Sequence, residues 1–492
     1  MDNILIENDL EEVLNLLNII NEEDTEGLSS ETKKQQWGGV YYDKLSHESI
    51  GKTVSKIQNE AYRLFGSTNA LYPSVWPSIA NMQKDLISLC VDFCKGKHNA
   101  QKGLCTSGGT ESILLSLLAH REWAYSKGIK FPEIIAASTC HGACHKACFY
   151  FGMKLILVKP DEATQRISAV EVEPYINENT IMIYCSAPTF PHGVVDDVQS
   201  LSSLAYRRKI GLHIDNCLGG ILLQCAQKSN LLLKNGYANA AANGFENIGV
   251  TSMSIDLHKY GFSSKGVSAV VFRNNHLRQF VFHPVAPVNG GAATGGGYIT
   301  PTLAGSRSGA PIAASWATMK FMSKHFSRII ERIHKAYLTI KYGARLIEGI
   351  DIVGDTEICV VSFRSSIPSK VTNRQIAKRM RKKGWDLFSS ENPSSCGICI
   401  GEQHIYTCDK FCKDLTATMA ELRKVPKTRA SMDTVSSDHS SGVYQAAQAN
   451  VTESKMKRNL IRFIENGLDR NTHHRTKEFT NLIDEFENSS RL

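Results

Sequence analysis

The sequence lacks the features of a membrane-spanning or secreted protein. Its 492 residues contain no apolar run of about 18 residues or more, which is the length that a spanning helix needs. No basic segment followed by an apolar stretch opens the chain, so no secretory signal is indicated. The 14 cysteines follow no repeated spacing, which is typical of a large protein from a reducing compartment. We expect a soluble, cytoplasmic protein without a transmembrane anchor and with free thiols.

The sequence also lacks internal repeats and the common nucleic-acid-binding motifs. The formal net charge is +8, but residues 1–30 hold nine acidic residues and no Lys or Arg. The rest of the chain therefore sets all 56 basic residues against 39 acidic ones. Such a basic body suits an anionic substrate or an anionic membrane surface, although a solvated surface rich in Lys explains it equally well. Nucleic acid is disfavoured because no zinc-finger spacing, basic zipper or aromatic RNA-binding pattern accompanies the charge.

Hydrophobic patterning divides the chain into four expected segments. Apolar residues from Ile6 to Ile20 recur every three or four positions, which predicts an amphipathic helix that docks or packs in a dimer. The expected segments are an N-terminal helical part at 1–60, a large domain at 61–310, a connecting helix with a small C-terminal domain at 311–470, and a polar acidic tail at 471–492.

Between about residue 100 and residue 275, short β-rich runs alternate with helical stretches. This alternation predicts an α/β domain with a mostly parallel sheet, in which ligands bind at the carboxyl ends of the strands. The expected strands are Ile134–Ala137, Leu155–Lys159, Ile181–Cys185, Gly211–Asp215, Thr251–Ile255 and Val267–Arg273.

The C-terminal part of the chain has a different pattern. A glycine-rich loop at Gly290–Gly297 precedes Ala310–Lys335, which reads as one long helix. The strand-like runs Ile358–Arg364 and Cys396–Gly401 surround the basic helical stretch Asn373–Lys383. Together they predict a smaller α+β domain.

A glycine turn precedes an amphipathic run near residue 110. Gly108 and Gly109 let the backbone approach a phosphate closely, while Thr110 and the start of the following helix offer hydrogen bonds. By itself this signal is weak, because a Gly-Gly turn before a helix is common.

Two strand-like runs each end in a polar side chain of interest. Asp215 is followed by Asn216-Cys217-Leu218-Gly219-Gly220, and it either holds a pyridinium nitrogen protonated or caps the next helix. Lys259 follows His258, and near cationic neighbours or when desolvated its lowered pKa would make it a competent amine for a Schiff base. A surface lysine after a histidine is equally common.

His141 lies shortly after a predicted strand, where it could stack on an aromatic ring or be an ordinary structural histidine. The order of glycine turn, His141, Asp215 and Lys259 within one α/β domain is that of fold-type I pyridoxal-phosphate enzymes. From about Trp37 to about Leu468 the chain resembles the sphingosine-1-phosphate lyases of the group II pyridoxal-phosphate-dependent decarboxylase superfamily. The segments that carry this resemblance are Ser186–Gly193, Asp215–Gly220, His258–Gly261 and Pro301–Arg307.

Amino-acid decarboxylases of the same superfamily typically have Asn-Pro-His-Lys before the Schiff base. Here the corresponding residues are Asp256-Leu257-His258-Lys259, which favours a lyase over an amino-acid decarboxylase. The resemblance implies a fold-type I α/β architecture, with a mostly parallel seven-stranded sheet and a smaller α+β C-terminal domain. It also implies pyridoxal 5'-phosphate as cofactor and a homodimer with shared active sites.

The resemblance implies a role for each matching residue. Lys259 would form the Schiff base, Asp215 would pair with the pyridinium nitrogen, and His141 would stack on the ring. The residues implied to hold the cofactor phosphate are Gly108, Gly109, Thr110, His258 and Ser306, the last from a loop that reaches across the dimer interface.

On the substrate side, Lys265 and Tyr41 match family residues of the active site, and either could meet the substrate phosphate. Tyr72 stands where relatives have an active-site histidine. A tyrosine can donate to phosphate, but it is a poorer proton shuttle than histidine at neutral pH. Residues Ala293-Thr294-Gly295-Gly296 also depart from the family text, so the changes bear on substrate identity more than on the cofactor.

The expected reaction is cleavage of the C2–C3 bond of sphingosine 1-phosphate, a phosphorylated sphingoid base, to a long-chain aldehyde and phosphoethanolamine. Tyr41, Lys259 or the cofactor phosphate could be the base for the 3-hydroxyl. Two other functions stay open: an amino-acid decarboxylase, and a catalytically weak protein that binds sphingolipids or makes transient contact with a membrane surface.

Two remaining features are better explained by ordinary structure than by a function. Cys396, Cys399, His404, Cys408 and Cys412 could ligate zinc, but the intervening isoleucines read as ordinary strands, so no metal is predicted. The tail from Glu478 to Leu492 resembles carboxy-terminal signals for delivery into a host cell, yet an unstructured tail explains it better.

Overall fold

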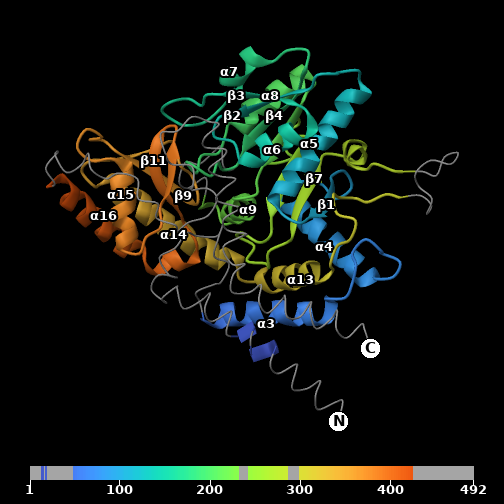
Figure 1. Cartoon of the computed structure of the whole chain (residues 1–492), viewed down its shortest axis with the longest axis horizontal. Helices are drawn as coiled ribbons and strands as arrows, with labels where there is room; N and C mark the ends of the chain where they lie inside the picture. The colour runs from blue at the N-terminus through green and yellow to red at the C-terminus, as the bar shows by residue number, and fades with distance from the viewer. Residues whose placement is uncertain (1–12, 16, 19–47, 232–241, 286–297, 425–492) are drawn as a thin grey trace, which may run out of the picture.

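A computed structural model describes residues 13–15, 17–18, 48–231, 242–285 and 298–424. They form a large sheet covered by helices and a second, smaller sheet toward the C-terminus (Figure 1). Outside these residues lie Tyr41, the glycine-rich loop, the C-terminal tail, and all but five residues of the helix expected near the N-terminus; those five are helical.

The large sheet has seven strands in the order β1-β7-β6-β5-β4-β2-β3. Strands β3, β2, β4, β5 and β6 are parallel, and β7 runs antiparallel to both of its neighbours. The predicted mostly parallel, seven-stranded sheet is confirmed. The strands are β1 Lys102–Thr106, β2 Glu133–Ala137, β3 Lys154–Val158, β4 Thr180–Ser186, β5 Gly211–Asp215, β6 Ser252–Asp256 and β7 Ser268–Phe272.

Every residue of β2, β4, β5, β6 and β7 is buried, because helices cover both faces of the sheet, whereas the edge strand β3 is half exposed. Strand β1 was not among the expected strands, since its five residues contain only two apolar side chains. The helices before the C-terminal part are α3 Glu48–Phe65, α4 Pro77–Phe93, α5 Gly109–Ser126, α6 Gly142–Phe151, α7 Ala169–Val172, α8 Val198–Arg208, α9 Gly220–Lys228 and α12 Asn275–Arg278, with 3-10 turns η1 Glu173–Tyr175 and η2 Gln279–Val281.

The prediction of one continuous helix over Ala310–Lys335 is wrong. The structure has two helices, α13 Ala310–Met322 and α14 Phe326–Arg345. Between them the hydroxyl of Ser323 donates to the carbonyl of Lys320 (2.7 Å), and the amide of His325 bonds to Met322 (2.8 Å). These local bonds end α13 and redirect the chain, so α13 packs on α3 while α14 packs on the C-terminal helix.

The C-terminal part is a smaller α+β domain, as expected. Its sheet has the order β10-β11-β9-β8, and every neighbouring pair is antiparallel. Its elements are β8 Ile350–Ile352, β9 Val360–Ser365, α15 Asn373–Lys382, β10 Phe388–Glu391, β11 Ser394–Cys399, η3 Glu402–Tyr406 and α16 Cys408–Arg423.

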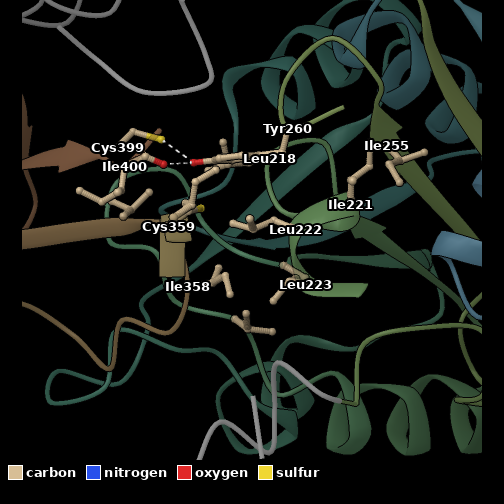
Figure 2. Packing of buried hydrophobic residues seen from close by; sticks show 14 of the residues in the cluster. Leu218, Ile221, Leu222, Leu223, Ile255, Tyr260, Ile358, Cys359, Cys399 and Ile400 are labelled. Carbon is tan, nitrogen blue, oxygen red and sulfur yellow. Dashed lines mark hydrogen bonds between the residues drawn. The ribbon is translucent and has the colours of Figure 1, made fainter. Parts of the chain in front are cut away.

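A buried apolar contact joins the two sheets. Figure 2 shows Leu222 and Leu223 of α9 beside Ile358, which precedes β9. In the same cluster the hydroxyl of Tyr260 donates to the carbonyl of Ile400 (2.7 Å). Because Tyr260 follows β6 and Ile400 follows β11, this bond ties the two sheets together.

All 14 cysteines lie in the described part of the chain and are free thiols. Among the helices that the structure describes, none has both the length and the apolar character needed to cross a bilayer.

Candidate active site

A cavity of about 430 Å³ opens at the carboxyl ends of β4, β5 and β6, facing the start of α5. It lies where ligands gather in a parallel sheet. The structure brings together here seven of the residues proposed from sequence: Gly108, Gly109, Thr110, His141, Asp215, His258 and Lys259.

Lys259 lies in the turn that follows β6, and its Nζ is 2.9 Å from Oδ2 of Asp256. Burial alone would lower the pKa of Lys259, but Asp256, with Cys217 and Asp215, outweighs burial and raises it. We expected cationic or apolar surroundings that lower this pKa, and that expectation is wrong in sign. The carboxylates hold Nζ as an ammonium.

Asp256 is a site residue that sequence reasoning missed. It ends β6, is buried, and accepts a hydrogen bond from the Ser268 hydroxyl (2.6 Å), with Nε2 of His258 at 3.6 Å. Burial would raise the pKa of Asp256, but Lys259 and His258 lower it, so the carboxylate is ionised. The feature of the sequence that could have indicated Asp256 is its position at a strand end, three residues before Lys259.

Asp215 ends β5 and presents a carboxylate to the cavity. Its Oδ1 accepts from the Cys217 amide (3.0 Å) and its Oδ2 from the Tyr184 hydroxyl (2.5 Å). Burial would raise the pKa of Asp215, yet His141, Tyr184 and Lys259 lower it. The helix-cap alternative fails, because α9 starts after Gly219 without a side-chain cap.

His141 is the N-cap of α6, and its Nδ1 accepts a hydrogen bond from the Ala143 amide (3.1 Å). Burial lowers the pKa of His141, so the ring is neutral. An accepting Nδ1 leaves the ring hydrogen on Nε2. The capping bond thus fixes both the tautomer and the orientation of a ring that lines the cavity.

The donor groups of this cavity fit pyridoxal phosphate. A Cβ on Gly109 would lie 2.7 Å from Sγ of Cys217 and 2.8 Å from Oδ1 of Asp256, so only glycine fits at this turn. A Cβ on Gly108 would meet nothing within 4 Å, which leaves space beside the first turn of α5. The amides of that turn have no partner inside the helix and suit a phosphate. The ionised Asp215 suits a pyridinium.

Two residues predicted for the substrate, Tyr72 and Lys265, and one predicted for the cofactor phosphate, Ser306, lie outside this cavity. Tyr72, Lys265 and Ser306 do not line the cavity, and all three are exposed. Nζ of Lys265 donates to the carbonyl of His258 (3.2 Å), while Ser306 bonds through its hydroxyl to Nδ2 of Asn69 (3.1 Å). These residues form what we call the rim.

The cysteines considered for zinc lie on two elements of the C-terminal domain. Cys396 and Cys399 belong to β11, and Cys408 and Cys412 to α16. Across the described parts of the chain, no three His, Cys, Asp or Glu side chains cluster as metal ligands would.

Comparisons with known proteins identify the family to which this sequence is similar. Residues 77–365 match the model of the pyridoxal-dependent decarboxylase conserved domain. Sphingosine-1-phosphate lyase of Saccharomyces cerevisiae is 35% identical over 400 residues, which cover 80% of this chain and 64% of that protein. The lyase of Dictyostelium discoideum is 35% identical over 379 residues, which cover 77% and 67%.

Among solved structures, a sphingosine-1-phosphate lyase of Burkholderia pseudomallei superposes with a TM-score of 0.76 at 27% identity. The match covers 85% of this chain and 92% of that one. Glutamate decarboxylase of Lactobacillus brevis, at 17% identity and a TM-score of 0.67, shares the fold. The chain spans only 64% and 67% of the two curated relatives named above.

Proposed function

Because this chain belongs to the pyridoxal-dependent decarboxylase family, we propose that it cleaves the C2–C3 bond of phosphorylated long-chain bases such as sphingosine 1-phosphate. The products would be a long-chain aldehyde and phosphoethanolamine. The observation that carries the proposal is the single cavity that joins Lys259, Asp215, His141 and the glycine turn. The substrate is inferred from the names of the curated relatives.

The residues of the cavity have separable tasks toward the cofactor. Lys259 would attach to it through Nζ, Asp215 would bind the ring nitrogen, and His141 would cover the ring. The groups that would hold the phosphate are Gly108, Gly109, Thr110 and His258, with Ser306 from a second chain. When bound, pyridoxal phosphate supplies the electron sink that accepts the pair left on C2 as the C2–C3 bond breaks.

The chain's own contribution to proton transfer centres on Lys259. Asp256 lies 2.9 Å from Nζ and keeps the free amine protonated. A protonated Nζ, once released from the cofactor, can deliver its proton to C2.

The rim would recognise the substrate phosphate and depends on a homodimer. Lys265 provides a cation one hydrogen bond away from His258, and Tyr72 provides a hydroxyl. Arg307 donates to the carbonyls of Cys105 and Thr106, which places the 305–307 loop beside the glycine turn. Exposure of the rim in one chain supports completion of the site by a second chain.

The test is to load the full chain with pyridoxal phosphate, reduce it with borohydride, and map the modified peptide by mass spectrometry. We expect the label on Lys259, no label in Lys259→Ala, and full labelling in the matched control Lys265→Ala. Incubation with sphingosine 1-phosphate should then yield hexadecenal and phosphoethanolamine. Labelling together with carbon dioxide from amino acids alone would favour a decarboxylase, and no labelling would exclude both enzyme functions.

A further inference from the structure

A chain of buried polar side chains runs from Asp215 into the interior of the large domain, away from the cavity. It comprises Ser254 and Ser252 of β6, His213 of β5 and Ser116 of α5, and each of these four is fully buried. Oδ1 of Asp215 is 3.3 Å from the Ser254 hydroxyl, which is 3.3 Å from Nε2 of His213. Nδ1 of His213 is 2.9 Å from Ser252 and 3.0 Å from Ser116.

The charge of Asp215 fixes the direction of the hydrogen bonds that link it to Ser254 and His213. An ionised carboxylate only accepts, so the Ser254 hydroxyl must donate to it. Ser254 is then left with lone pairs, and Nε2 of His213 must carry hydrogen and donate to them. Burial lowers the pKa of His213 to about 3, so the ring is neutral and its Nδ1 accepts from a serine hydroxyl. The donors of these bonds therefore point toward Asp215.

Tyr184 reaches the same carboxylate from β4. Its hydroxyl donates to Oδ2 at 2.5 Å, and its ring packs against the ring of His213 with centroids 5.4 Å apart. Asp215 is thus held at Oδ1 by the Cys217 amide and the Ser254–His213 pair, and at Oδ2 by Tyr184. Three donors on a buried carboxylate stabilise its charged form.

A purely structural reading does not account for this arrangement. Between a sheet and a helix, apolar side chains pack without the desolvation cost that buried hydroxyls and imidazoles carry. The neighbouring strand positions are indeed apolar, with Leu212, Ile214, Met253 and Ile255 fully buried. The four polar side chains of this line stand among them and lead to Asp215.

We propose that His213 and Tyr184 are positioning residues that keep Asp215 ionised and aimed at the cavity, so that a ring nitrogen bound there stays protonated. The proposal rests on the proposed cofactor site. It assigns to His213 an Nε2–H tautomer, which is a property of the chain itself.

The first measurement is the tautomer of His213, from ¹⁵N-histidine NMR of the full chain, with the signal assigned by its loss in His213→Asn. Hydrogen on Nε2 is expected. Hydrogen on Nδ1, or a charged ring at neutral pH, overturns the proposal. This result does not depend on the cofactor, so it separates failure of the inference from failure of the proposed function.

The second measurement is the ¹⁵N signal of the ring nitrogen in enzyme loaded with ¹⁵N-labelled pyridoxal phosphate. In Tyr184→Phe and His213→Asn the signal should shift toward neutral pyridine, and the cofactor dissociation constant should rise about tenfold. In His213→Gln, whose amide can replace the Nε2–H donor, both values should stay near those of the unmodified enzyme.

His120→Asn is the matched control, because His120 is also buried but bonds to the Ser116 carbonyl and to Thr251 rather than toward Asp215. It should leave the ring-nitrogen signal unchanged. If all four variants keep the unmodified signal and affinity, the polar chain is only structural and the proposal is wrong. If the unmodified protein binds no cofactor, the proposed function and this inference both fail.

Discussion

The floor and the rim of the cavity are built in opposite ways. On the floor, Asp215 and Asp256 are buried, Lys259 is mostly buried, and each has partners within 3.0 Å. On the rim, Tyr72 is 55% exposed and contacts Trp76 edge-on, while Lys265 and Ser306 are also exposed. The floor residues are therefore held in place within one chain, whereas the rim residues face solvent in it.

The largest expected effect is on the floor, in Asp215→Asn. The amide cannot hold a ring nitrogen protonated, so kcat should fall about a hundredfold or more while the cofactor can still attach to Lys259. Steady-state product formation at measured cofactor occupancy tests this. If kcat is unchanged in this variant, Asp215 has no electronic role in the reaction. The proposed contrast between floor and rim then fails as well.

The next effect concerns stability and comes from Asp256→Asn in the cofactor-free chain. Removing the carboxylate leaves the mostly buried ammonium of Lys259 without its 2.9 Å partner, which should cost about 3 kcal/mol of the free energy of unfolding at pH 7. Urea unfolding measures it. Ser268→Ala keeps the charge pair and removes one hydrogen bond, so it should cost only about 1 kcal/mol.

The same pair predicts the pH dependence of that stability. The pKa of Asp256 is lowered in the folded chain, so its contribution is full above its ordinary value of 3.8 and is lost as the pH falls further. The pKa of Lys259 is raised above 10.5, so its contribution is full below that value. The difference between the unmodified chain and Asp256→Asn should stay constant from pH 6 to pH 9 and shrink in acid; a difference that grows in acid would contradict it.

A rim substitution should behave differently. Lys265→Met removes an exposed cation from the proposed phosphate contact, so KM for sphingosine 1-phosphate should rise about fivefold with kcat unchanged. The cofactor should stay attached, as measured by borohydride labelling. If kcat instead falls as much as expected for Asp215→Asn, Lys265 takes part in the reaction as the floor residues do. That outcome would contradict the distinction between floor and rim.

The smallest expected effect is that of Tyr260→Phe. It leaves the buried carbonyl of Ile400 without its donor, at a cost of about 1 kcal/mol in urea unfolding. Tyr62→Phe, at an exposed tyrosine of α3, is the control and should change nothing. Equal stability of the two variants would show that the bond between the sheets contributes nothing.

The sequence predicted the site most accurately where a polar residue directly follows a strand-like apolar run. Asp215 and Lys259 follow apolar runs, and the structure places both on the floor. It failed where the outcome depends on a neighbour that only folding supplies. The sign of the pKa shift of Lys259 is set by Asp256, and a local turn at Ser323 breaks a helix whose apolar pattern is continuous.

The positions of the three rim residues relative to one another could not be predicted from the sequence, for a related reason. Tyr72, Lys265 and Ser306 come from three separate loops, and their spacing in the sequence carries no information on whether they meet. The buried line from Asp215 to His213 was also missed, because serines within a strand look like weak points of the sheet rather than donors. Alternation of serine with apolar residues in Ser252–Asp256 was the available signal.

The hydrogen bond from the Tyr260 hydroxyl to the Ile400 carbonyl couples the C-terminal domain to Lys259, the residue proposed to carry the cofactor. Tyr260 adjoins Lys259 in the chain, so a hinge motion that carried β11 away from β6 would either break this bond or pull on the lysine. Such a linkage rigidifies the side of the cavity that faces the C-terminal domain.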